Sequence, residues 1–278
     1  MRIASRSVVL TIVLAIVVLV SAGAGRADDI GWKAAHDTDP HLALTPEQQE
    51  MTTLKRAAEA QSVMIEFAGP MRGARQWVEC GPTCGGGGGA YPTGASIASN
   101  QKAQTTSYYC GPAAVHEALD ALGVWLTQAA AAAELNTTTD GTAWSGGGTS
   151  PSGYPVPDVL NVHQTRDYYV PQNVASPTAN AINTYESDLE MNIWALEVPL
   201  IGDAWEVPNG PHLTGHPGNK EIFHWFEIRG YQGSGGSTMY EDSVHGAASI
   251  SWSGNVPAYS TLSSNTIVTI ISGRGYVW

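Results

Sequence analysis

The stretch "IFHWFEIRGYQGSGGSTMYEDSV" (residues 222–244) contains two strand-like runs on either side of a glycine-rich segment. Aromatic and β-branched residues are frequent in both runs, and such residues favour strands. The intervening "GSGGS" supplies the small residues that a tight reversal requires. We therefore predict a β-hairpin formed by residues 223–231 and 237–243. This hairpin would bring the carboxylate of Asp242 beside the imidazole of His224.

Helical patterns come first along the chain, and strand-like patterns follow. Thr45 and Gln48 have the spacing of a capping box, and Pro46 suits a first helical position. The predicted helices cover residues 45–67, 113–123, 126–136, 158–166 and 184–193, and the predicted strands cover 194–204, 222–232, 237–244 and 265–278. This order predicts an α+β fold in which the N-terminal helices pack on an antiparallel sheet.

Residues 1–27 have the pattern of a secretory signal peptide. Two early arginines precede an apolar run at residues 8–20, and small residues follow that run. Cleavage after Ala24 and cleavage after Ala27 both fit the pattern, and an uncleaved anchor is the alternative. We expect a secreted, extracellular protein that has no stable membrane association after cleavage.

Composition and net charge indicate a protein with a hydrophobic core that does not bind nucleic acid. The 278-residue chain is 43% hydrophobic, which is enough to build a core, and its net charge is −12. Such an acidic surface repels phosphate backbones, so nucleic-acid binding is not expected.

We predict an N-terminal extension at residues 28–98, a pro-segment or docking arm that ends in a glycine-rich linker, and a main domain at residues 99–278. The glycine run lacks the Gly-Lys-Ser/Thr of a phosphate loop.

The chain has three cysteines, which is an odd number for a secreted protein. Cys80 and Cys84 are close in sequence and form the natural disulfide pair, which leaves Cys110 free. Both Cys80 and Cys110 begin a Cys-Gly-Pro triplet, but glycines follow the first triplet and a helical pattern follows the second. A free cysteine buried in the core is the alternative interpretation of Cys110.

Cys110 directly precedes a helix, where unpaired N–H groups and a positive partial charge stabilise a thiolate. Gly111 would allow a substrate backbone to approach closely. Gln104, six positions upstream, could point its amide toward the thiol and, together with the Cys110 N–H, hold an oxyanion. Gln101 is the less well spaced alternative.

A nucleophilic thiolate needs a base, and the base needs a third group to orient it. His224 in the first strand of the hairpin is the candidate base, and Asp242 is the candidate orienting carboxylate. Glu241 and Asp203 compete with Asp242 for that role.

The blocks "Q-x5-CGPA" and "HWFEIRGY…YEDS", in this order, resemble the C39-like cysteine peptidases of the secreted bacterial type. The resemblance covers roughly residues 99–278. It implies a papain-like fold, a peptide or protein substrate, no cofactor, and a triad with an oxyanion-hole glutamine. These roles map onto Cys110, His224, Asp242 and Gln104. Many members carry Asp-Pro where this chain has Asp-Ser, and the transporter-associated members carry membrane and ATPase regions that are not found here.

Other interpretations remain open. A thiol acyltransferase or amidase acting on cell-wall peptides could use the same residues, and a non-catalytic secreted binding protein could keep the same fold. His212 and His216 have a spacing that suits a metal on a helix. Pro217 and Gly218 interrupt any helix there, so we predict no metal and instead a loop over the cleft.

Overall fold

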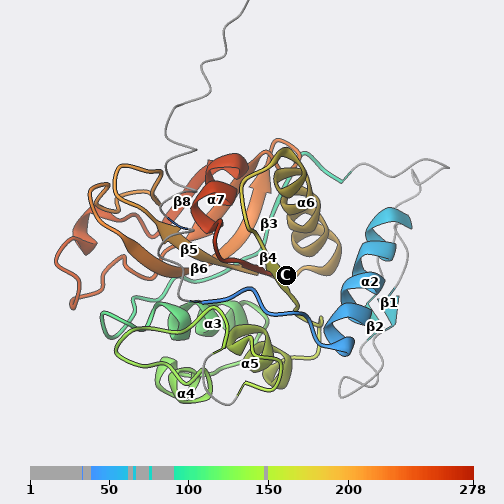
Figure 1. Cartoon of the computed structure of the whole chain (residues 1–278), viewed down its shortest axis with the longest axis horizontal. Coiled ribbons are helices and arrows are strands. Elements are labelled where there is room, and N and C mark those ends of the chain that lie inside the picture. The colour runs from blue at the N-terminus through green and yellow to red at the C-terminus, as the bar shows by residue number, and fades with distance from the viewer. Residues whose placement is uncertain (1–32, 34–38, 62–64, 67–74, 77–90, 147–149) are drawn as a thin grey trace, which may run out of the picture.

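The computed structural model describes residues 33, 39–61, 65–66, 75–76, 91–146 and 150–278 (Figure 1). The predicted signal peptide, the glycine run and the predicted Cys80–Cys84 disulfide lie outside these residues.

Most helices of the described chain precede the long strands of the sheet, and one α-helix lies between the last two strands. The helices are α2 (Pro46–Gln61), α3 (Cys110–Ala121), α4 (Gln128–Glu134), α5 (Pro155–His163), α6 (Ala179–Glu190), the π-helical η1 (Met191–Leu196), the 3-10 turn η2 (Ser253–Asn255) and α7 (Ser264–Ile271). The strands are β1 (Ile65–Glu66), β2 (Arg75–Gln76), β3 (Gly94–Ser96), β4 (Pro171–Asn173), β5 (Leu200–Glu206), β6 (Ile222–Gln232), β7 (Ser237–Glu241), β8 (Tyr259–Ser263) and β9 (Gly275–Val277).

The main sheet is antiparallel and has the strand order β4-β9-β5-β6-β7-β8, with β3 paired to the distal part of β6. Helices α3, α4 and α5 lie together on one side of this sheet, and α6 and α7 lie on the other (Figure 1). Every residue of β5 is accordingly buried. The predicted α+β class and the antiparallel sheet are confirmed.

The predicted hairpin is also present, as β6 and β7. Its last pair is Gln232 with Ser237, and the turn between them has positive φ at Gly233, Ser234 and Gly235. Glycine adopts such angles without steric cost, which explains the composition of this turn. On the sheet, β6 pairs with both β5 and β7 and therefore lies at the centre of the strand order.

Local capping signals confirm two of the predicted helix starts. Thr45 and Gln48 form the reciprocal capping box, with side-chain to backbone distances of 3.0 and 3.2 Å. Thr127 accepts a hydrogen bond from the Ala130 N–H at the start of α4. Satisfied donors at the first turn make these positions favourable helix starts.

The predicted strand at residues 265–278 is wrong over its first half, which forms helix α7. Ser263 caps this helix by accepting from the Thr266 N–H, and Ile267, Ile270 and Ile271 are fully or almost fully buried. Their spacing places three branched side chains on one helical face against the sheet. Packing of this face outweighs the strand preference of β-branched residues, and only β9 remains extended.

The predicted strand at residues 194–204 likewise begins late. Trp194 and Leu196 belong to η1, and this helix ends at Glu197, which has a left-handed φ of 52°. The extended chain of β5 then starts at Leu200.

Described parts of the predicted N-terminal extension pack on the rest of the chain. Lys55 in α2 forms an ion pair with Asp167, and both side chains are fully buried. Lys33 donates to three carbonyl groups at the end of α7 and just after it. Strand β3 joins the main sheet. The sequence-based boundary at residue 98 therefore divides elements that the structure packs together.

Within the described residues, no helix combines the length and the apolar character needed to cross a bilayer.

Candidate active site

Cys110 is the first residue of α3 and is only 8% exposed. The preceding residue, Tyr109, offers no side-chain cap, so the first N–H groups of the helix remain available. Burial by itself raises the pKa of the Cys110 thiol. The hydrogen bond and charge of His224, together with the backbone amides of Trp225 and Gly111, outweigh that effect and lower the pKa below its ordinary value. Cys110 is the free cysteine of the described chain.

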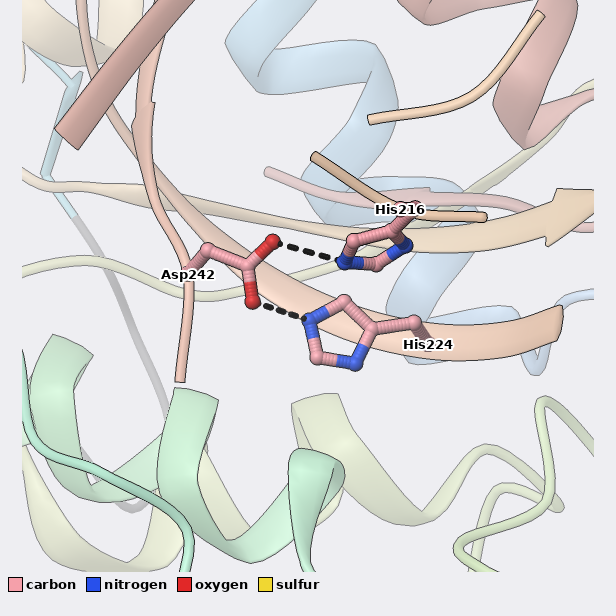
Figure 2. Close-up of side chains that lie close together, drawn as sticks. All are labelled: His216, His224 and Asp242. Atoms are coloured by element: carbon pink, nitrogen blue, oxygen red, sulfur yellow. Dashed lines mark hydrogen bonds and ion pairs between the residues drawn. The ribbon is translucent and has the colours of Figure 1, made fainter. Parts of the chain in front are cut away.

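His224 lies on β6, pairs with Ala204 of β5 and is 3% exposed. Its Nε2 is 3.0 Å from Oδ1 of Asp242, as Figure 2 shows. Nδ1 is therefore the ring nitrogen left for the hydrogen bond with Cys110. Burial lowers the pKa of His224, but the charge and hydrogen bond of Asp242, with those of Cys110, raise it well above its ordinary value. A lowered thiol pKa beside a raised imidazole pKa indicates a thiolate–imidazolium pair.

Asp242 directly follows β7 and is buried. Its Oδ1 also accepts the N–H of Val244 at 2.9 Å, and its Oδ2 is 3.0 Å from Nε2 of His216. Burial raises the pKa of Asp242, but the charge of His224 and the hydrogen bond from His216 hold it well below its usual range. The carboxylate is thus ionised and faces two histidines (Figure 2).

The structure separates Asp242 from its two competitors. Glu241 is grouped with two other buried glutamates, and Asp203 lies 3.9 Å from the Arg274 guanidinium. Of the three carboxylates, Asp242 is the one that forms an ion pair with His224.

Gln104 precedes α3 and is 3% exposed. Its amide donates one hydrogen bond to the Thr106 carbonyl at 2.7 Å, and its Oε1 accepts from the Ser243 hydroxyl at 3.2 Å. One amide hydrogen therefore has no acceptor within the described chain. Gln101, in contrast, uses its amide on the carbonyls of Asp242 and His245, at 3.0 and 3.1 Å. This difference favours Gln104 for the oxyanion role.

His216 has a contact that sequence reasoning missed. It lies in the segment between β5 and β6, which forms no helix or strand, as predicted. Its side chain is fully buried, and its ring bridges Glu206 and Asp242 at 2.9 and 3.0 Å. His212, which was considered together with His216 as a possible metal ligand, instead contacts the carbonyls of Gly210 and Lys220. No sequence signal identifies this bridge, because Glu206 and Asp242 belong to different strand ends that only the sheet brings together.

A second buried cluster lies among the elements that carry the triad. Glu117 of α3, Glu227 of β6 and Glu241 of β7 place carboxyl oxygens within 4.8 Å of one another. Glu117 accepts the Lys102 N–H at 2.7 Å. Burial, followed by the neighbouring carboxyl groups, raises the pKa of Glu117 and of Glu227 well above the ordinary value. Burial therefore favours the protonated, uncharged form of both groups in the folded protein.

His216, His224 and Asp242 likewise bring donor atoms within 4.8 Å. Nε2 of His216 is hydrogen-bonded to Asp242 and Nε2 of His224 forms an ion pair with it, so contacts within the protein account for the arrangement. We assign no metal ligand in either cluster.

Gly111 packs against a fixed neighbour. A Cβ at this position would lie 2.3 Å from Oγ1 and 2.7 Å from Cβ of Thr142. The Thr142 hydroxyl forms a hydrogen bond of 2.7 Å with the Thr137 hydroxyl. The backbone carbonyl of Thr142 accepts a hydrogen bond of 2.9 Å from the Trp225 indole. The sequence predicts that Gly111 allows a substrate backbone to approach closely, but Thr142 fills the space where a side chain of residue 111 would lie.

Replacing Gly111 with alanine is expected to displace the start of α3, because Thr142 cannot retreat without losing these bonds. We expect a loss of about 1–3 kcal/mol in the free energy of unfolding, typical of overpacking, and slower alkylation of Cys110. Urea denaturation and thiol labelling measure the two effects. Gly218→Ala is the matched control, since nothing lies within 4 Å of its added Cβ. Equal stability and reactivity of both variants would contradict the packing argument.

No protein-family model matches this chain, and a search of curated proteins found no match. The assignment of the site therefore depends on its geometry and on the sequence motifs. Chemically, the arrangement offers a nucleophilic thiolate, a proton carrier, an ionised carboxylate behind that carrier, and amide donors near the thiolate.

Proposed function

We propose that this protein is a cysteine peptidase with a papain-like fold that hydrolyses peptide bonds in peptide or protein substrates. The observation that carries the proposal is the buried contact series from Cys110 at a helix start, through His224, to Asp242. The helix that carries the nucleophile packs on the antiparallel strands that carry the base, which supports the papain-like arrangement. The pattern of residues 1–27 extends the proposal to action outside the cell.

In this proposal the Cys110 thiolate attacks the peptide carbonyl carbon, and the carbonyl electrons move to its oxygen. The Cys110 N–H and the Gln104 amide stabilise that oxyanion. His224 donates its proton to the departing amine nitrogen as the C–N bond breaks, leaving a thioester on Cys110. Water then attacks the thioester carbon while His224 accepts one of its protons. The C–S bond breaks, its electron pair returns to Cys110 as the thiolate, and the carboxylic acid leaves. Asp242 stays ionised and orients the ring throughout.

Ser243 supports the role of Gln104. Its hydroxyl donates to Oε1 of Gln104, and its carbonyl accepts the Gln104 N–H at 2.8 Å. The departure from the Asp-Pro of many C39-like peptidases therefore supplies an additional side-chain bond that proline could not make.

Acyl transfer to an amine is a second candidate, because an amine can attack the same thioester that water attacks in hydrolysis. Adding an amine nucleophile to the reaction and measuring the product masses separates the two reactions, because transfer gives an amide and hydrolysis gives a carboxylic acid.

The direct test is the rate of Cys110 alkylation by iodoacetamide over about pH 4 to 10, read by peptide mass spectrometry so that the cysteines are distinguished. We expect rapid reaction with an apparent pKa well below about 8.5, and loss of that reactivity at acid pH in His224→Ala. His163→Ala is the control, because this histidine pairs with Glu134 on other helices. An inert Cys110, or one with an ordinary pKa, would refute the proposal.

A further inference from the structure

The contact series at the active site continues beyond Asp242. His216 Nε2 is 3.0 Å from Asp242 Oδ2, and His216 Nδ1 is 2.9 Å from Glu206 Oε2. The other oxygen of Glu206 accepts the Leu213 N–H at 2.7 Å. The His216 and Glu206 side chains are fully buried. Both nitrogens of His216 and both oxygens of Glu206 thus have partners.

The hydrogen-bond inventory sets the protonation state of His216. A carboxylate only accepts hydrogen bonds, and a neutral imidazole has one N–H donor. With a carboxylate at each nitrogen, both bonds form only when both nitrogens carry hydrogen. With both carboxyl groups ionised, His216 is an imidazolium ion. Charges then alternate along the series, from the Glu206 carboxylate to His216, to Asp242, to His224 and to the Cys110 thiolate.

The surroundings of His216 come from several elements. Glu206 ends β5, Asp242 follows β7, and the ring of His224 on β6 lies 5.2 Å away, centroid to centroid. The indole of Trp252 packs edge-on against His216 at 4.7 Å, and His212 lies 3.9 Å from Glu206. The charges nearest to His216 are thus the carboxylates that it contacts and the imidazolium of His224.

We propose that His216, held by Glu206, is a positioning residue that orients the Asp242 carboxylate toward His224 and keeps it ionised in acid. The oxygen bound to His216 cannot rotate away without breaking a buried, charge-assisted bond, so the other oxygen stays directed at His224. The positive charge of His216 also opposes protonation of Asp242. This inference deepens the proposed function, since it concerns the pH range over which the thiolate pair exists.

The sign of the effect follows from charge alone. Removing a nearby cation raises the pKa of a neighbouring titratable group, because the anion of an acid loses an attractive partner and the cation of a base loses a repulsive one. In His216→Gln, the acid limb set by Cys110 and Asp242 and the alkaline limb set by His224 should both move to higher pH. Glutamine retains an N–H that can reach Asp242, so the variant changes the charge more than the contact.

The experiment is the pH profile of Cys110 alkylation by iodoacetamide in the full chain. In His216→Gln we expect the acid midpoint to rise by about one pH unit, so that the rate at the wild-type midpoint falls about fivefold. Because this variant leaves Glu206 buried without its cation, the double variant Glu206→Gln/His216→Gln, which removes both charges, is measured as well. It should shift the acid midpoint in the same direction. His163→Gln is the control histidine.

The outcomes separate the two proposals. A wild-type Cys110 that is inert refutes the peptidase proposal itself. If wild-type Cys110 is reactive with a depressed pKa, and the folded variants keep its midpoints, His216 has no positioning role and this inference is overturned. A lower melting temperature with unchanged midpoints shows a purely structural role and overturns it equally. Raised midpoints in both variants, with His163→Gln unchanged, support it.

Discussion

Cys110→Ala is expected to lower peptide cleavage by about 10⁴-fold or more, the scale seen when a nucleophile is removed from a catalytic triad. The chain then has no thiolate at the start of α3, and its other two cysteines are distant in sequence. The measurement is the appearance of new peptide N-termini in a complex peptide mixture, read by mass spectrometry. His224→Gln should cause a comparable loss, because it removes the proton carrier that also stabilises the thiolate.

The two losses should not add. Cys110 and His224 act as one ion pair, so the double variant is expected to be no slower than either single variant. His163→Gln should cleave at the wild-type rate. Thermal melting confirms that each variant is folded. If Cys110→Ala cleaves the same peptide bonds at the wild-type rate, the nucleophile assignment is wrong.

The second large effect concerns the buried glutamates. The native pKa of Glu227 is raised, first by burial and then by Glu241 and Glu117, so the folded protein holds a proton that the unfolded chain releases. Stability from this group is complete below the unfolded pKa, about 4.3, and is lost as the pH rises toward the native value. Over that window each pH unit costs about 1.4 kcal/mol per protonated group.

Glu227→Gln removes the need for that proton while keeping the shape of the side chain. We expect the variant to gain in free energy of unfolding relative to wild type as the pH rises above about 4.3, and to show little gain at about pH 4. Urea denaturation at several pH values measures the difference. Glu50→Gln, on the exposed surface of α2, is the control. A difference that does not grow with pH would show that Glu227 is ionised in the folded protein.

Several local features could be predicted because short-range chemistry determines them. The capping box at Thr45 uses groups three residues apart, and the turn after β6 needs residues that tolerate positive φ. The proximity of His224 and Asp242 was predicted from the hairpin, but the observed register pairs Glu227 with Glu241, so the two residues of the ion pair are not directly opposite each other. Helix α7 was not predictable in this way. Its β-branched residues favour a strand, but packing of their side chains against the sheet makes the segment helical.

The sequence by itself indicated the antiparallel hairpin, a helix beginning close to Cys110 and the candidate triad, because turn composition and strand patterning mark the hairpin and the motifs around Cys110, His224 and Asp242 mark the triad. Only the tertiary structure decided that Glu206 and His216 extend the series behind Asp242, and that Glu117, Glu227 and Glu241 converge in the core. Those contacts join residues from separate elements, so they exist only after α3 and the strands have packed. Burial then supplies the low dielectric that makes their charges and protons matter.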